Sequence, residues 1–77
     1  MRFAVLSSSG QVLAYGVLCI LEDDEGDWIL AFRTDRGKLI EGGKIAADGD
    51  LSQASQVLYR RFFQTWGISG VTLTSQA

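Results

Sequence analysis

Short segments rich in β-branched, aromatic and other apolar residues occupy the first half of the chain, separated by turns rich in glycine, serine and aspartate. Such segments indicate β-strands, and residues of these three kinds are common in tight turns. The pattern predicts strands over residues 2–7, 11–21 and 28–34, joined in order as an antiparallel meander. A fourth strand is predicted over residues 38–41, and Gly42-Gly43 then ends it.

Residues 51–66 show a helical rather than an alternating spacing. Apolar residues three and four positions apart form one continuous stripe along this segment, made up of Leu51, Ala54, Leu58 and Phe62. Asp50 is a suitable N-cap, and Gly67 is a suitable left-handed residue for the C-terminal end. The sequence therefore predicts one amphipathic helix, followed by a last strand over residues 71–74.

The predicted order of elements, β-β-β-(β)-α-β, belongs to the α+β class. It corresponds to a mostly antiparallel sheet of four or five strands with one amphipathic helix. The chain has 77 residues, of which 47% are hydrophobic and 21% are charged. This balance is typical of a globular domain, and the length leaves room for only one core. We therefore expect residues 1–77 to form a single small domain.

The predicted elements carry more apolar surface than one helix packed on one sheet face can bury. Both faces of the strand over residues 11–21 are apolar, and Tyr59, Phe63 and Trp66 widen the apolar arc of the helix to about half its circumference. A strongly curled sheet would absorb part of this surplus. Homodimerisation, through the open sheet face or the aromatic flank of the helix, would also bury it. The sequence is compatible with both explanations.

Charge and residue usage exclude several classes of function. Seven Lys and Arg against nine Asp and Glu give a net charge of -2, a bias too weak to indicate a partner by itself. The chain has no His, and its single cysteine, Cys19, lies in an apolar stretch where we expect a small core residue. Neither a signal peptide nor an apolar run of membrane-spanning length is visible, so we expect a cytoplasmic protein without membrane contact.

Two short motifs could in principle bind ions. The acidic segment over residues 22–27 does not have the spacing of an EF-hand loop, and we interpret it as a soluble hairpin turn. The sequence Gly42-Gly43-Lys44 lacks the earlier glycine and the following Ser or Thr of a P-loop. We therefore expect no metal, no cofactor and no catalytic residue, and the protein is predicted not to be an enzyme.

The segment from Leu39 to Ile45, together with Gly49-Asp50, Ala54 and Gly67-Ile68, resembles a distorted Nudix box. The resemblance implies a degenerate nucleotide-binding fragment of a family that hydrolyses nucleoside diphosphate derivatives. That family holds magnesium through glutamates on the helix, whereas the matching stretch here, residues 60–67, contains no carboxylate. The departure removes the residues that would carry the family's chemistry.

The leading hypothesis is a non-catalytic protein-protein interaction or regulatory module. We expect a small homodimeric accessory protein of bacterial or phage type, with a protein partner of unknown identity. The candidate interaction surface lies on the predicted helix and consists of Tyr59, Arg60, Arg61, Phe63 and Trp66. The alternative is a small nucleic-acid-binding protein that uses a basic and aromatic patch, and a degenerate Nudix-like fragment is the third hypothesis.

Overall fold

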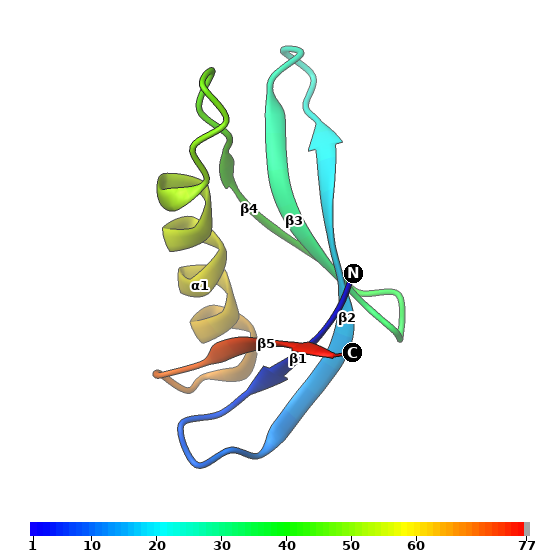
Figure 1. Ribbon diagram of the computed structural model, residues 1–77, viewed down its shortest axis with the longest axis vertical. Coiled ribbons are helices and arrows are strands. Elements are labelled where there is room, and N and C mark those ends of the chain that lie inside the picture. The colour runs from blue at the N-terminus through cyan, green and yellow to red at the C-terminus, as the bar shows by residue number, and fades with distance from the viewer. Residues whose placement is uncertain (77) are drawn as a thin grey trace.

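The computed structural model describes residues 1–76 and has five strands and one helix in this part of the chain (Figure 1). In chain order they are β1 (Arg2–Leu6), β2 (Val12–Glu22), β3 (Trp28–Thr34), β4 (Leu39–Lys44), α1 (Ser52–Trp66) and β5 (Thr72–Gln76). The strands form one sheet in the order β4-β3-β2-β1-β5, and every neighbouring pair is antiparallel. The predicted α+β class and antiparallel meander are confirmed.

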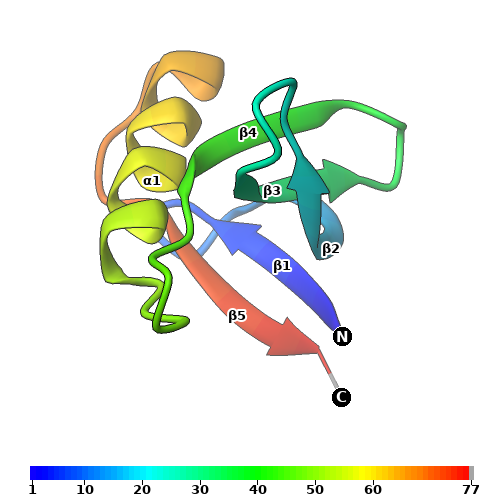
Figure 2. The same ribbon diagram turned by 90° about the horizontal axis from the view of Figure 1, so that it is seen from above.

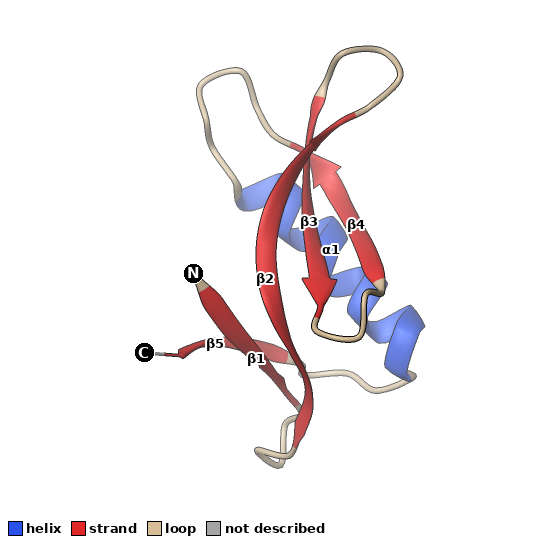
Figure 3. Ribbon diagram, turned by 90° about the vertical axis from the view of Figure 1, so that its right-hand side faces the viewer, coloured by secondary structure: helices blue, strands red, loops and turns tan. Residues whose placement is uncertain are grey.

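β2 bends in its middle and divides the sheet into two arms. It pairs with β1 along its first half and with β3 along its second half, and the two pairings overlap at Gly16 and Val17. A Cβ atom on Gly16 would collide with the backbone oxygen of Arg33 and lie 2.8 Å from the ring of Phe32. Glycine therefore allows β3 to approach the bend. Figure 3 shows β1 and β5 on one side of β2 and β3 and β4 on the other.

The hydrophobic core lies between α1 and the face of the sheet that curves around it (Figure 2). The buried cluster consists of Val5, Leu30, Phe32, Ile40, Ala54, Leu58, Phe62 and Val71. β2 contributes partly buried residues that pack against this cluster, namely Leu13, Ala14 and Leu18. The ring of Phe62 packs edge-on against Phe32, with 5.7 Å between ring centroids. The curled sheet thus absorbs part of the apolar surplus that the sequence indicated.

β4 extends through Gly42-Gly43 to Lys44, so the prediction that this glycine pair ends the strand is wrong. The register between β3 and β4 shifts opposite the pair, as in a β-bulge. A Cβ atom on Gly42 would lie 2.9 Å from the Cβ of Leu58, and one on Gly43 would lie 3.0 Å from a methyl group of Val57. The glycines therefore allow α1 to pack closely on β4.

The C-terminal end of α1 uses the residue that the sequence indicated, whereas the prediction of Asp50 as the N-cap is wrong by one position. The helix begins at Ser52 and its N-cap residue is Leu51, whose side chain makes no capping bond. Asp50 instead accepts hydrogen bonds from the Ser52 backbone N–H at 2.9 Å and from the Ser52 hydroxyl at 2.7 Å. At the other end Gly67 adopts a φ of 70°, and its N–H donates to the Phe63 carbonyl at 2.7 Å.

The face of the sheet opposite α1, termed here the outer face, carries the apolar side chains Val17, Cys19, Leu21 and Ile29. Each is partly buried by its sheet neighbours. Cys19 pairs with Ala31 on this face and is not part of the core cluster, so the expectation of a core cysteine is wrong. Within residues 1–76 no helix combines the length and apolar character that crossing a membrane requires.

Candidate interaction site

The aromatic residues of the predicted helix surface divide between solvent and core. Tyr59 and Phe63 lie one helical turn apart on the same flank of α1, with 38% and 51% of their surface exposed. Trp66 is partly buried, and its ring packs on Phe62 with 5.5 Å between centroids. Tyr59 also contacts Phe62 edge-on at 5.6 Å. The exposed part of this surface is therefore a narrow aromatic strip rather than a broad patch.

The two arginines of the predicted surface lie on different sides of α1. At about 100° per residue, Arg60 projects about 60° from Phe63, whereas Arg61 projects about 160° away from it. Both side chains are exposed. Arg60 can act together with the aromatic strip, and Arg61 points toward the opposite flank. The helix does not bring all five predicted residues onto one face.

A second apolar surface, which the sequence did not reveal, lies at the β2–β3 hairpin end of the molecule. The 15 residues of α1 span about 22 Å, whereas the 11 residues of β2 span about 36 Å, so the strands continue beyond the start of the helix. Figure 1 shows the hairpin extending past α1 beside the β4–α1 loop. The helix-side face of this extension holds Ile20 and Trp28, with 58% and 55% of their surface exposed.

Ile20 and Trp28 form one wall of a groove whose other wall is the β4–α1 loop. The groove has a volume of about 460 Å³, and it is lined by Ile20, Trp28, Ile45, Ala46, Ala47 and Gly49. No charged side chain lines it. We name it the hairpin groove. Its two wall residues are more than half exposed, so it is open to solvent.

Hydrogen bonds and an ion pair hold the walls of the hairpin groove in place. The backbone N–H of Ile45 donates to the carbonyl of Trp28 at 2.9 Å, which fixes the start of the loop against β3. The Lys44 Nζ lies 3.0 Å from a carboxylate oxygen of Asp27, and this hydrogen bond and the charge of Asp27 raise the pKa of Lys44. The site is therefore formed before any partner arrives.

The acidic segment at the hairpin tip is a turn, as the sequence analysis interpreted it. One carboxylate oxygen of Asp23 accepts the backbone N–H groups of Glu25 at 2.9 Å and Asp27 at 2.8 Å. The Gly26 N–H donates to the Asp23 carbonyl at 3.0 Å. Within residues 1–76 no group of three or more Asp, Glu or Cys side chains converges as metal ligands would.

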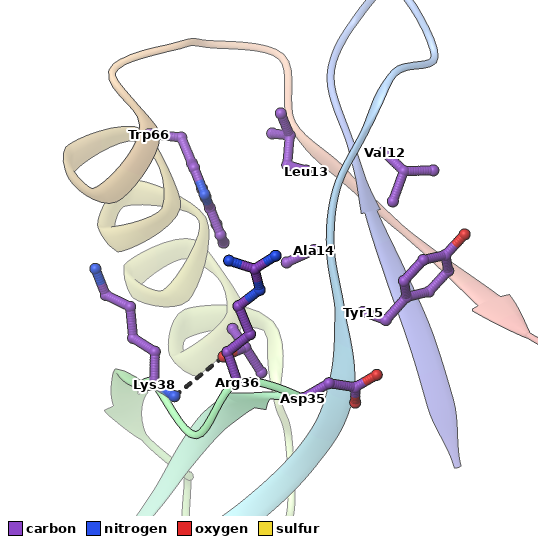
Figure 4. A pocket seen from close by; sticks show the side chains of 9 residues that line it. Val12, Leu13, Ala14, Tyr15, Asp35, Arg36, Lys38 and Trp66 are labelled. Carbon is purple, nitrogen blue, oxygen red and sulfur yellow. Dashed lines mark hydrogen bonds between the residues drawn. The ribbon is translucent and has the colours of Figure 1, made fainter.

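A second cleft, of about 610 Å³ and with both apolar and charged lining residues, lies near the other end of α1 (Figure 4). The C-terminal end of the helix, the first half of β2 and the β3–β4 turn supply its lining residues, which are Val12, Leu13, Ala14, Tyr15, Thr34, Asp35, Arg36, Lys38 and Trp66. In Figure 4 the Arg36 side chain points toward the indole of Trp66. The Lys38 backbone N–H donates to the Thr34 hydroxyl at 3.0 Å, which fixes the turn. We name it the Trp66 cleft.

The charges of the Trp66 cleft are unevenly neutralised. Asp35 forms a two-point ion pair with Arg2, which raises the pKa of the guanidinium, and Arg2 also lies 5.6 Å from the ring centre of Tyr15. Arg36 and Lys38 form no ion pair with any carboxylate of residues 1–76. The cleft therefore combines an indole wall with two positive charges, a combination suited to an anion that carries a flat ring.

The hairpin groove and the Trp66 cleft are two concave surfaces of residues 1–76 that could receive a ligand. One sequence signal for the groove was present, because the predicted strand over residues 11–21 exceeds the predicted helix in length. No family model matches this chain, and no curated protein and no solved structure shows significant similarity to it.

Proposed function

We propose that this chain is a non-catalytic interaction module that acts in the cytoplasm and binds a protein partner through the hairpin groove. The observation that carries the proposal is the continuation of the core face of the sheet past the start of α1. It leaves Ile20 and Trp28 more than half exposed beside the apolar β4–α1 loop. A preformed apolar groove with an accessible tryptophan is the kind of surface that anchors partner side chains at protein interfaces.

Affinity capture from the cells that produce the protein tests this function. The full chain should retain one partner in a stable ratio, and the double variant Ile20→Ser and Trp28→Ser should lose it. Leu39→Ser is the matched control, because Leu39 is a similarly exposed apolar strand residue that lines neither the groove nor the Trp66 cleft. Circular dichroism establishes that each variant is folded. Equal capture by the groove variant and the wild type would rule out this surface.

The outer face supports the predicted homodimer. Val17, Cys19, Leu21 and Ile29 lie side by side there, and within residues 1–76 the helix covers only the opposite face. Two copies stacked through their outer faces would form the sheet-on-sheet packing that is common in β-proteins. The hairpin groove lies on the helix side, so such a dimer leaves both grooves accessible.

A second candidate function is nucleic-acid binding at the Trp66 cleft. It is favoured by the position of Arg36 and Lys38, which form no ion pair within residues 1–76, beside an indole on which a base can stack. Fluorescence anisotropy of labelled single-stranded DNA and RNA at two salt concentrations tests it. Affinity should fall as salt rises, and Arg36→Ala with Lys38→Ala should weaken binding and reduce the salt slope.

Arg33→Ala is the control for that titration, because Arg33 lies on the outer face, away from the cleft. Binding that is insensitive to salt, or that is equally weakened by Arg33→Ala, would remove the nucleic-acid function.

A further inference from the structure

The small net charge of the chain conceals an excess of negative charge at one end of the molecule. Seven of the nine carboxylates lie at the end of β2 or in the two loops that border the hairpin groove: Glu22, Asp23, Asp24, Glu25, Asp27, Asp48 and Asp50. Within residues 1–76, Lys44 is the basic residue that contacts them, so seven negative charges and one positive charge give -6 at this end. The other two carboxylates and six basic residues give +4 over the rest of the chain.

The hydrogen bonds within this acidic end do not cancel its charge. Asp23 accepts backbone amides, Asp48 accepts the amide of Asp50, and Asp50 accepts the amide and hydroxyl of Ser52, all of which are neutral donors. Only Lys44 brings a positive charge, through its contacts with Asp27 at 3.0 Å and Glu25 at 3.9 Å. The groove therefore lies in a region of negative potential with an uncharged, apolar floor.

We propose that the hairpin groove binds a cationic segment, in which a large apolar side chain enters the groove and flanking Lys or Arg residues reach the carboxylates of both loops. This partner chemistry rests on the proposed function. Opposite charge speeds encounter and excludes other partners, since acidic segments and nucleic acids would meet like charge at this end. A second copy of the chain would have to present one of its basic surfaces, because two acidic ends repel each other.

The two loops are placed to select such a segment by its spacing. The β2–β3 turn and the β4–α1 loop stand on opposite sides of the groove and extend toward the same end of the molecule (Figure 1). A chain lying across the groove therefore meets carboxylates before and after its apolar anchor. Binding by charge alone would not require Trp28, and binding by apolar contact alone would not depend on salt.

Selection of a displayed library of random 16-residue peptides on the immobilised full chain tests the inference. Enriched peptides should carry a large apolar residue flanked by Lys or Arg. Synthetic copies should lose binding to the Ile20→Ser and Trp28→Ser double variant. Their affinity should fall about tenfold for the triple variant Asp24→Asn, Glu25→Gln and Asp48→Asn, since each exposed ion pair contributes roughly 0.2–1 kcal/mol. Glu41→Gln, a carboxylate in the middle of β4, is the matched control and should have no effect.

The outcomes separate this inference from the proposed function. Enriched neutral or acidic peptides that require Trp28 but ignore the triple variant would overturn the cationic partner and leave the groove as an interaction site. Peptides that bind the groove variant as well as the wild type would overturn both. If the wild-type protein self-associates and the groove variant is monomeric, the occupant of the groove is a second copy of the chain. That result would overturn the proposal of a cationic segment.

Discussion

At the scale of single residues, Gly16 is the position where the fold leaves the least room. It sits where β2 passes from its pairing with β1 to its pairing with β3, and the space beside its Cα is filled by the backbone of Arg33 and the ring of Phe32. Backbone atoms in a sheet cannot move aside without breaking the ladder of hydrogen bonds. A side chain at this position therefore has to displace β3 itself.

We expect Gly16→Ala to destabilise the protein by about 1–3 kcal/mol, the usual cost of overpacking a filled site. In a chain of this size each 1 kcal/mol lowers Tm by roughly 4–8 °C, which thermal unfolding followed by circular dichroism measures. Gly43→Ala is the control, because the methyl group there meets mainly the side chain of Val57 and should cost less. A Gly16→Ala variant as stable as the wild type would mean that β2 does not bend in this way.

The residues that could be predicted are those whose role depends on near neighbours in the chain. Leu58 and Phe62 were recognised as core residues from helical spacing, and both are buried. Gly42 is predicted as a strand breaker from its residue type alone. Its actual role, close packing against Leu58 16 positions later, leaves no signal in the neighbouring sequence. Trp28 was placed on a strand correctly, but its exposure depends on where α1 begins.

At the scale of elements, α1 depends on a carboxylate just outside its first turn. Asp50 accepts two hydrogen bonds from Ser52, the backbone bond being the stronger cause, and together they hold the pKa of Asp50 below its ordinary value. The backbone N–H of Ser52 is one of the helix amides that have no partner within the helix. Deprotonated Asp50 satisfies it, and the neutral acid does so less well.

We expect carbon-detected NMR titration to place the pKa of Asp50 below that of an unstructured aspartate, about 3.9. Because the folded pKa is lowered, the stabilisation is present above the unfolded pKa and is lost as the pH falls through the folded pKa. Ser52→Ala removes the hydroxyl donor and should move the pKa part of the way back. Asp50→Asn should abolish this part of the acid dependence of stability. An unshifted pKa in the wild type would contradict these two hydrogen bonds from Ser52 to Asp50.

The candidate surfaces were harder to predict than the elements because they form between elements. Tyr59 and Phe63 were identified as exposed aromatics from their position on the helix, and they are exposed. The hairpin groove combines Ile20 with Ala47, and the Trp66 cleft combines Arg36 with Trp66, in each case residues more than 25 positions apart. Periodicity reports the faces of one element and carries no information about which elements meet.

At the scale of the whole molecule, charge and apolar surface together constrain how two copies can associate. The acidic end holds six excess negative charges and the remainder four excess positive charges, and the long axis of the molecule is 37 Å. Two outer faces stacked with their strands parallel would bring both acidic ends together. Stacking with the strands antiparallel instead places each acidic end near the basic part of its partner, which is compatible with a two-fold axis.

This geometry gives the proposed homodimer a signature in ionic strength. Sedimentation equilibrium at micromolar concentration should show a mass of two chains, and the dimer should weaken as salt rises from about 50 to 500 mM, because screening removes the attraction between unlike ends. Leu21→Lys places a charge on the outer face and should yield monomers that remain folded by circular dichroism. Gln56→Lys, on the exposed side of α1, is the control and should remain dimeric. A mass of one chain for the wild type at every salt concentration would refute the homodimer and leave the outer face without a partner. A dimer that becomes more stable as salt rises would be consistent with the apolar interface but would exclude the antiparallel arrangement of charge.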